Sequence, residues 1–213
     1  MFDKIKKYIE AKRTINNWDY IFTNNPEIEK IGSRQEYIEY TKTIFPESTF
    51  KKVCFHGGRK GIVKFLSPND PNFKKNKGVN SATKDYGIYF TADKELAKTY
   101  TKGYKKEDRQ IYSVLVNIKK PLRDNGFFAL HIRKKFNYNI LNPQSITLKD
   151  HERLTQSGYD SIIWQGDNGE IIVFQPEQIH ILGTEEDLNK FKQWKQTKTI
   201  SQIITKTQTY EPR

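Results

Sequence analysis

Three short apolar runs, far apart in the chain, constrain its fold more than any other feature. They are Cys54–Arg59, Gly87–Thr91 with Ala97–Tyr100 following it, and Asn168–Phe174. Each places a polar residue of a type used in catalysis or ligand binding at the end of a run that is typical of a β-strand. Pairing of these strands would bring one histidine, two tyrosines and one glutamate into one cleft. No other part of the chain offers a comparable set.

The order of the remaining elements indicates an α+β fold. A chain of 213 residues is large enough for one domain with a buried core and appendages. Predicted strands and helices do not alternate as βαβ units, which argues against a doubly wound sheet. We predict a helical segment over residues 1–45, a core over 46–183, a helix over 184–197 and a polar, loose tail over 198–213.

Capping residues place several of these elements. Ser33 is a plausible N-cap for a helix over residues 35–45, and Thr91 or Asp93 for one over 93–101. Gly158 ends a short helix over 150–156. Thr184 caps the last helix. Further strands are predicted over residues 52–56, 110–118, 159–164, 170–174 and 178–182. Pro121 is expected to end the strand over 110–118.

Several classes of protein are disfavoured. Cys54 is the only cysteine, so neither an intramolecular disulfide nor a cysteine-rich zinc site is available, and His131, His151 and His180 lack the spacing of metal ligands. No apolar stretch approaches the ~20 residues of a membrane span, and the first residues lack the apolar region of a signal peptide. We therefore predict a metal-free protein of the cytoplasm, or one delivered into a host cytoplasm.

Positive charge is concentrated in the middle of the chain. Residues 51–135 hold 21 Lys and Arg against 7 Asp and Glu, whereas the rest of the chain holds 16 against 18. A Lys-rich solvated surface explains this as well as a binding role does. As a binding feature, it would attract a dinucleotide, a nucleic acid or an acidic protein.

The polar residues of the three runs have both structural and chemical explanations. His56 is followed by two glycines, which would let a ligand approach the backbone closely. It could equally be a structural histidine before a turn. Tyr89 and Tyr100 fit a core as well as a site. Glu170 opens an apolar run, where a carboxylate costs desolvation free energy unless it has a partner.

Together these motifs resemble ADP-ribosyltransferases of the poly(ADP-ribose) polymerase and diphtheria toxin type, which carry a His-Tyr-Glu triad. Tyr100 lies eleven residues after Tyr89, the family's spacing between its active-site tyrosine and the tyrosine that stacks on nicotinamide. His56-Gly57 resembles the family's His-Gly pair, and Arg59 stands where many members carry arginine. Glu170 begins a strand like that of the catalytic glutamate. The resemblance covers residues 35–183 and is greatest to ADP-ribosyltransferase domains of phage and mobile-element polyvalent proteins.

The resemblance implies an ADP-ribosyltransferase-like fold, with two packed, mostly antiparallel sheets that form an NAD cleft and with flanking helices. His56, Tyr89 and Glu170 would lie on three strands and face that cleft. NAD would be the substrate, and no metal would be needed.

The resemblance also implies a role for each residue. Glu170 would stabilise the positive charge that develops on the ribose, and Tyr89 and Tyr100 would stack on nicotinamide. The backbone of Gly57 would hold the carboxamide, and His56 the adenosine-side ribose. The pyrophosphate would be neutralised by Arg59 and by a basic loop that carries Lys74, Lys75 and Lys77.

The acceptor of ADP-ribose stays open. Arginine-modifying relatives carry Glu or Gln two residues before the catalytic glutamate, where this chain has Asn168. The acceptor could be protein or nucleic acid, and the product a single ADP-ribose or a polymer. Two alternatives also stay open: an NAD glycohydrolase toxin that uses water as acceptor, and a non-catalytic basic module that binds nucleic acid or belongs to a phage structure.

Overall fold

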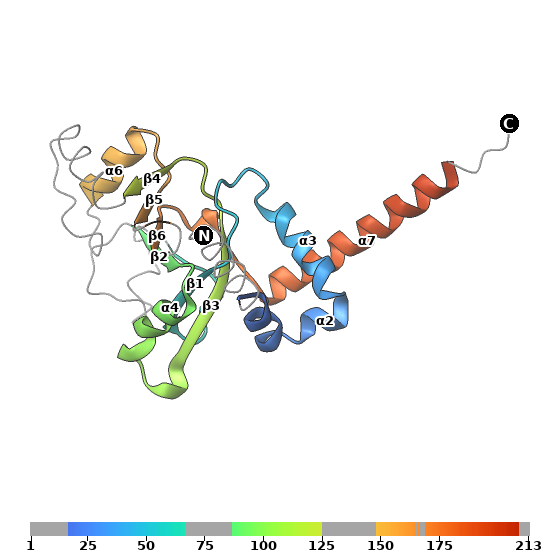
Figure 1. Cartoon of the computed structure of the whole chain (residues 1–213), viewed down its shortest axis with the longest axis horizontal. Coiled ribbons are helices and arrows are strands. Elements are labelled where there is room, and N and C mark those ends of the chain that lie inside the picture. The colour runs from blue at the N-terminus through green and yellow to red at the C-terminus, as the bar shows by residue number, and fades with distance from the viewer. Residues whose placement is uncertain (1–16, 67–86, 125–147, 165, 167–168, 209–213) are drawn as a thin grey trace, which may run out of the picture. The chain divides into compact units, whose positions relative to one another are not determined.

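Two compact units make up the chain, one formed by Met1–Pro46 with Leu182–Arg213 and the other by Glu47–Ile181. The computed structural model describes residues 17–66, 87–124, 148–164, 166 and 169–208 (Figure 1). The first unit is helical and the second carries a sheet with helices, so the predicted α+β class is confirmed. The boundaries predicted for the functional core stay a prediction.

The described part of the first unit is mainly helical. Residues 17–24 are helical, followed by α2 (Glu27–Ile31), α3 (Arg34–Ile44) and the long α7 (Glu185–Gln208). Ser33 caps α3 as predicted: its hydroxyl accepts from the backbone N–H of Glu36, and the Glu36 carboxylate accepts from the Ser33 N–H at 2.7 Å. This reciprocal pair satisfies two of the backbone N–H groups that a helix start leaves without partners.

The last helix is longer than predicted, because α7 continues to Gln208 rather than ending at residue 197. The prediction of a loose tail from residue 198 is therefore wrong over much of its length. No glycine or proline interrupts residues 184–208, so nothing in the backbone forces the helix to stop. Lys195 and Lys198 of α7 also pair with Glu36 and Glu39 of α3, at 3.3 and 2.6 Å.

The second unit is built on one mixed sheet of seven strands in the order β4-β5-β6-β2-β1-β3-β7. Neighbouring strands pair antiparallel, except β4 with β5, which are parallel. The strands are β1 (Cys54–Arg59), β2 (Ile88–Thr91), β3 (Arg109–Val116), β4 (Pro121–Asp124), β5 (Ser161–Trp164), β6 (Glu170–Val173) and β7 (Ile179–Ile181). The helices described in this unit are α4 (Lys94–Tyr100) and α6 (Leu148–Gln156), with 3₁₀ turns at Thr101–Gly103, Lys106–Asp108 and Pro176–Gln178.

The prediction of two packed sheets is wrong for the described residues, because hydrogen bonds join all seven strands edge to edge. The connection between β1 and β2 is narrow, however, with Phe55 and Thr91 as its one registered pair. Strands from both sides of that pair contribute to a single apolar cluster, which includes Cys54, Phe90, Val114 and Val173. The two sets of strands therefore share one core.

A second, smaller apolar cluster involves α6, which Figure 1 draws beside β4 and β5. Leu154 of α6 packs with Leu122, Ile162, Ile172 and Phe174. In β6, Ile172 belongs to this cluster while Ile171 and Val173 belong to the larger one. Side chains of a strand alternate between its two faces, so the run of Ile and Val in β6 is explained by burial on both faces.

Sequence reasoning missed β4, because Pro121 was expected only to end the preceding strand. Pro121 instead starts β4, which lies at the edge of the sheet beside β5. An edge strand tolerates a proline at its first residue, since one side of that strand has no ladder to complete. Among the helices that the structure describes, none combines the length and apolar character needed to cross a membrane.

Candidate functional site

Glu170 is a buried carboxylate in the middle of the sheet. It begins β6, where it lies opposite Thr91 of β2 and Trp164 of β5, and it is 8% exposed. Its Oε1 accepts a hydrogen bond from the Tyr100 hydroxyl. Its Oε2 is buried and has no hydrogen-bond partner among the described residues. Buried polar atoms are nearly always paired, so an open carboxylate oxygen marks a place where a donor fits.

Tyr100 reaches Glu170 from the last turn of α4. The Asp93 side chain caps this helix by accepting from the backbone N–H groups of Glu95 and Leu96. Burial, and then the hydrogen bond and charge of Glu170, raise the pKa of Tyr100 above its usual value, so its hydroxyl stays a donor at neutral pH. The residue is nevertheless 47% exposed. Tyr100 can thus hold Glu170 and still offer ring surface to a ligand.

A close approach of α4 to β1 makes this contact possible. A Cβ at Gly57 would lie 1.8 Å from the Ala97 carbonyl oxygen, well inside van der Waals contact. Only glycine leaves room for the backbone of α4 at this point. Sequence reasoning assigned Gly57 to the binding of a carboxamide, which stays a prediction. The structure adds a second reason for glycine, because Gly57 lets the helix that carries Tyr100 pack against β1.

Tyr89 lies on the same face of the sheet as Glu170. It pairs with Ile172, and Ile172 follows Glu170 by two residues, so all three share one face. The half-buried Tyr89 packs against the smaller apolar cluster with Ile172 and Phe174. Two of the three predicted triad side chains are thereby placed on one face of two neighbouring strands.

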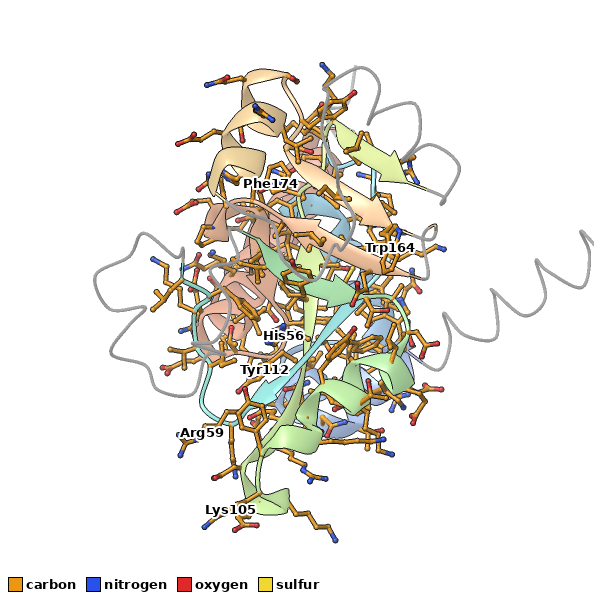
Figure 2. The ribbon with its side chains drawn as sticks, turned by 90° about the vertical axis from the view of Figure 1, so that its left-hand side faces the viewer. His56, Arg59, Lys105, Tyr112, Trp164 and Phe174 are labelled. Atoms are coloured by element: carbon orange, nitrogen blue, oxygen red, sulfur yellow. The ribbon has the colours of Figure 1, made fainter. Side chains whose placement is uncertain are left out.

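His56 lies on the other face, contrary to the expectation that all three side chains face one cleft. Its ring packs against Phe65, Phe90 and Tyr112, at centroid distances of 4.9, 5.7 and 6.5 Å, and Figure 2 shows His56 beside Tyr112. The reason is register: the pair of Phe55 with Thr91 puts Phe55, not His56, on the face of Glu170.

The hydrogen bond of His56 fixes its tautomer and links it to Tyr89. Nδ1 lies 2.8 Å from the backbone carbonyl oxygen of Tyr89. A carbonyl oxygen only accepts, so Nδ1 carries the proton and, in the neutral ring, Nε2 is an acceptor. Burial lowers the pKa of His56, although the Tyr89 hydrogen bond opposes this shift. His56 is therefore neutral at pH 7 and could accept a hydrogen bond from a ligand hydroxyl.

Arg59 lies at the far end of β1, opposite Arg109 of β3. Its side chain is 52% exposed, and its guanidinium lies 3.9 Å from the Asp108 carboxylate. The predicted acceptor residue Asn168 and the basic loop with Lys74, Lys75 and Lys77 lie outside the described residues.

Trp164 is a site residue that sequence reasoning missed. It is half-buried and lies directly opposite Glu170 on the neighbouring strand, so its side chain lies on the same face as the carboxylate. Figure 2 labels it at the end of β5. The sequence contained a signal for this pairing. Trp164 ends one predicted strand and Glu170 begins the next, so the two residues face each other across the turn that joins the strands as a hairpin.

No group of three or more His, Cys, Asp or Glu side chains within the described ranges could hold a metal ion. Catalysis without a metal stays a prediction. The polar side chains that the structure places near Glu170 are the Tyr100 hydroxyl bonded to it, Thr91 and Trp164 opposite it on the neighbouring strands, and Tyr89 on the same face. Such a set suits a planar ring and a hydroxyl donor.

Residues 50–186 match the family model described as ADP-Ribosyltransferase in polyvalent proteins, which is more than half of the chain. The match spans β1 through β7 and every described residue of the site around Glu170. No curated protein matches the sequence.

Proposed function

Because the chain belongs to the ADP-ribosyltransferases of polyvalent proteins, we propose that it cleaves the bond between nicotinamide and ribose in NAD and transfers ADP-ribose to a macromolecular acceptor. The observation that carries this proposal is the state of Glu170, whose Oε1 is held by Tyr100 and whose buried Oε2 has no partner among the described residues. A ribose hydroxyl is a donor of the kind that this oxygen needs.

Glu170 acts electrostatically in the proposed reaction. As the glycosidic C–N bond breaks, its electron pair leaves with nicotinamide, which becomes neutral, and positive charge develops on the ribose. The Glu170 carboxylate accepts from the 2′-hydroxyl through Oε2 and stabilises that charge. It also orients the acceptor, whose nucleophile attacks the ribose carbon and gives up its proton to Glu170 or water.

Tyr100 has two roles in this proposal. Its hydroxyl holds Oε1 of Glu170 and so turns Oε2 toward the ribose. Its half-exposed ring stacks on nicotinamide together with Tyr89, at roughly 1 kcal/mol for each ring. Trp164 lies across the strand from Glu170 and borders the space from which an acceptor approaches.

His56 acts from the other face of the sheet. Its Nδ1–H group holds the Tyr89 carbonyl, which fixes the backbone of the strand that carries Tyr89. Its Nε2 is left as an acceptor for a hydroxyl of the adenosine-side ribose, which would reach it where β1 and β2 separate beyond their single registered pair. Gly57 holds the carboxamide through its backbone, and Arg59 neutralises the pyrophosphate, as the family resemblance implies.

Incubation with NAD labelled in its adenosine half, together with a mixture of protein, RNA and DNA, tests the proposal. We expect release of free nicotinamide and label attached to a macromolecule. Release of nicotinamide with all label in free ADP-ribose would indicate an NAD glycohydrolase instead. Absence of nicotinamide release under all acceptor conditions would favour a non-catalytic binding module.

A further inference from the structure

The corner where β1 ends and β3 begins carries a dense set of exposed cations. The chain reaches β3 from α4 through the turns Thr101–Gly103 and Lys106–Asp108, and Lys60 N–H bonds the Asp108 carbonyl at 2.7 Å. Two acidic residues, Glu107 and Asp108, belong to the same corner. Six exposed cations surround them, which we call the basic corner: Arg59, Lys60, Lys102, Lys105, Lys106 and Arg109.

The pairing of Arg59 with Arg109 destabilises this corner in the absence of a ligand. The two residues are directly opposite in the antiparallel ladder, and like charges at such positions destabilise a sheet. Arg109 is held in place by the carbonyls of Tyr104 and Lys102, at 2.9 and 3.3 Å. The contact between Arg59 and Asp108 is long and exposed, so it offsets little of the repulsion. A polyanion bound at the corner would relieve it.

Exposed aromatic surface adjoins the corner and favours nucleic acid over protein as the polyanion. Protein interfaces are built around a buried apolar core, but large exposed hydrophobic side chains near this corner are isolated residues, Val63 and Tyr100. Tyr100 immediately precedes the turn that carries Lys102. A half-exposed aromatic ring beside a row of cations is the arrangement that binds unpaired bases and their phosphates. An aromatic ring has two faces, so the face of Tyr100 that nicotinamide does not cover stays available to a base.

We propose that the basic corner binds single-stranded nucleic acid and directs it toward Glu170. The path from corner to site is short along the chain, because Tyr100 bonds Glu170 and the first turn of the corner begins at Thr101. The direction toward Glu170 rests on the proposed transferase function, whereas binding at the corner does not. The nucleic acid is then the acceptor class for that activity.

The test measures how tightly the full chain binds a fluorescent single-stranded oligonucleotide of mixed sequence, first as DNA and then as RNA. The protein carries the substitution Glu170→Gln, and NAD is left out so that no transfer takes place. Affinity is followed from about 0.05 to 0.3 M salt, where each neutralised phosphate contributes a slope of about −0.7 in log K against log salt. The corner variant is Lys105→Gln with Lys106→Gln. Figure 2 shows Lys105 in the turn at the end of the corner. The charge-matched control is Lys42→Gln with Lys192→Gln, two exposed lysines of the helical unit.

We expect the corner variant to bind about 10- to 30-fold more weakly near 0.1 M salt, with a slope smaller in magnitude by about 1.4. The control should bind like the parent protein. Equal binding by the corner variant and the control would overturn the proposal. So would displacement of the oligonucleotide by an acidic peptide at lower concentration than by unlabelled strand, which would assign the corner to a protein. A duplex that competes as well as the single strand would overturn the assignment to unpaired bases.

Nicotinamide release separates this inference from the proposed function. In the wild-type background, Lys105→Gln with Lys106→Gln should release nicotinamide from NAD at the wild-type rate but label the oligonucleotide less. If the wild-type protein bound the strand and released no nicotinamide, the transferase proposal would fail while the corner remained. If it released nicotinamide and did not bind the strand, the corner assignment alone would fail.

Discussion

Two buried carboxylates, one in each unit, accept hydrogen bonds from tyrosine hydroxyls, yet they differ in how fully their oxygens are satisfied. Asp187 in α7 is completely buried. Its Oδ2 accepts from the Tyr37 hydroxyl and from the Gly183 N–H, and its Oδ1 accepts from the Tyr40 hydroxyl at 3.1 Å. Glu170 has one donor, Tyr100, and an Oε2 without a partner among the described residues.

The difference separates a structural carboxylate from one that is suited to a ligand. Burial and the charge of Asp187 raise the pKa of both Tyr37 and Tyr40, so these hydroxyls remain donors and tie α3 to α7. Removing either partner would leave a buried group unpaired. The open oxygen on Glu170 costs the fold desolvation free energy, and that cost is offset only when a donor arrives.

Glu170→Gln gives the largest expected effect. The variant keeps the shape of the side chain and removes the negative charge that acts on the transition state. We expect kcat for nicotinamide release to fall by about 10²–10³, the scale of losing one electrostatic stabiliser. NAD affinity, measured by calorimetry, should change by less than about tenfold, or ~1.4 kcal/mol, because the charge on the ribose is absent in the ground state. Release at the wild-type rate would contradict the proposed mechanism.

The second-largest effect is expected for Asp187→Asn, and it is a loss of stability. The amide loses the charge-assisted hydrogen bonds from two buried tyrosines, so the free energy of unfolding should fall by about 2–3 kcal/mol. Denaturant unfolding followed by far-UV circular dichroism measures this change.

Glu170→Gln is the matched control for stability, since it also replaces a buried carboxylate by an amide. Its free energy of unfolding should stay within about 1 kcal/mol of the parent value. Equal destabilisation by the two variants would break the comparison between a structural and a ligand-binding carboxylate.

The sequence predicted elements well where a local pattern determines them. Ser33 and Asp93 cap helices where they were expected to do so. The strands around His56, Tyr89 and Glu170 form as predicted, within a few residues at their ends. Family membership was also predictable, because three motifs in the family's order and spacing are seldom found together by chance.

The sequence did not predict features that depend on pairing between distant segments. Whether strands form one sheet or two is decided by the single Phe55–Thr91 pair, and that same register puts His56 on the opposite face from Tyr89. A shift of one residue would reverse every face, and no local pattern specifies it. Trp164 was missed for the same reason, because its relation to Glu170 exists only across a strand pair.

Tyr100→Phe tests whether the tyrosine hydroxyl prepares Glu170. The ring stays available for stacking, but Oε1 of Glu170 loses its donor. We expect kcat for nicotinamide release to fall roughly tenfold, on the scale of one hydrogen bond to a charged group, with little change in KM for NAD.

Tyr100→Ala separates the hydroxyl from the ring. Loss of the ring should also raise KM by about fivefold, since stacking at ~1 kcal/mol is already present in the ground state. If Tyr100→Phe kept the wild-type kcat, the hydroxyl would have no role of its own, and Glu170 would not depend on Tyr100 for its orientation. If the two variants changed kcat and KM alike, the ring would add nothing to the effect of the hydroxyl.

The smallest effect is expected for His56 and concerns how the free energy of unfolding depends on pH. It tests whether His56, whose ring is held by the Tyr89 carbonyl, contributes to stability as Asp187 does. Burial holds the pKa of His56 below its usual value of about 6.5. The unfolded chain therefore takes up this proton more readily than the folded one. The contribution to stability is present above about pH 6.5 and is lost as pH falls through the folded-state pKa, at no more than about 1.4 kcal/mol per pH unit.

Burial lowers the pKa of His151 as well, so both histidines act in the same direction. Urea unfolding at several pH values between about 7.5 and 5.5 should show a smaller loss of stability in His56→Gln than in the parent, and a further reduction when His151→Gln is added. An unchanged acid dependence in His56→Gln would mean that the ring is already solvated in the folded protein, and that its hydrogen bond to Tyr89 does not hold it in the sheet.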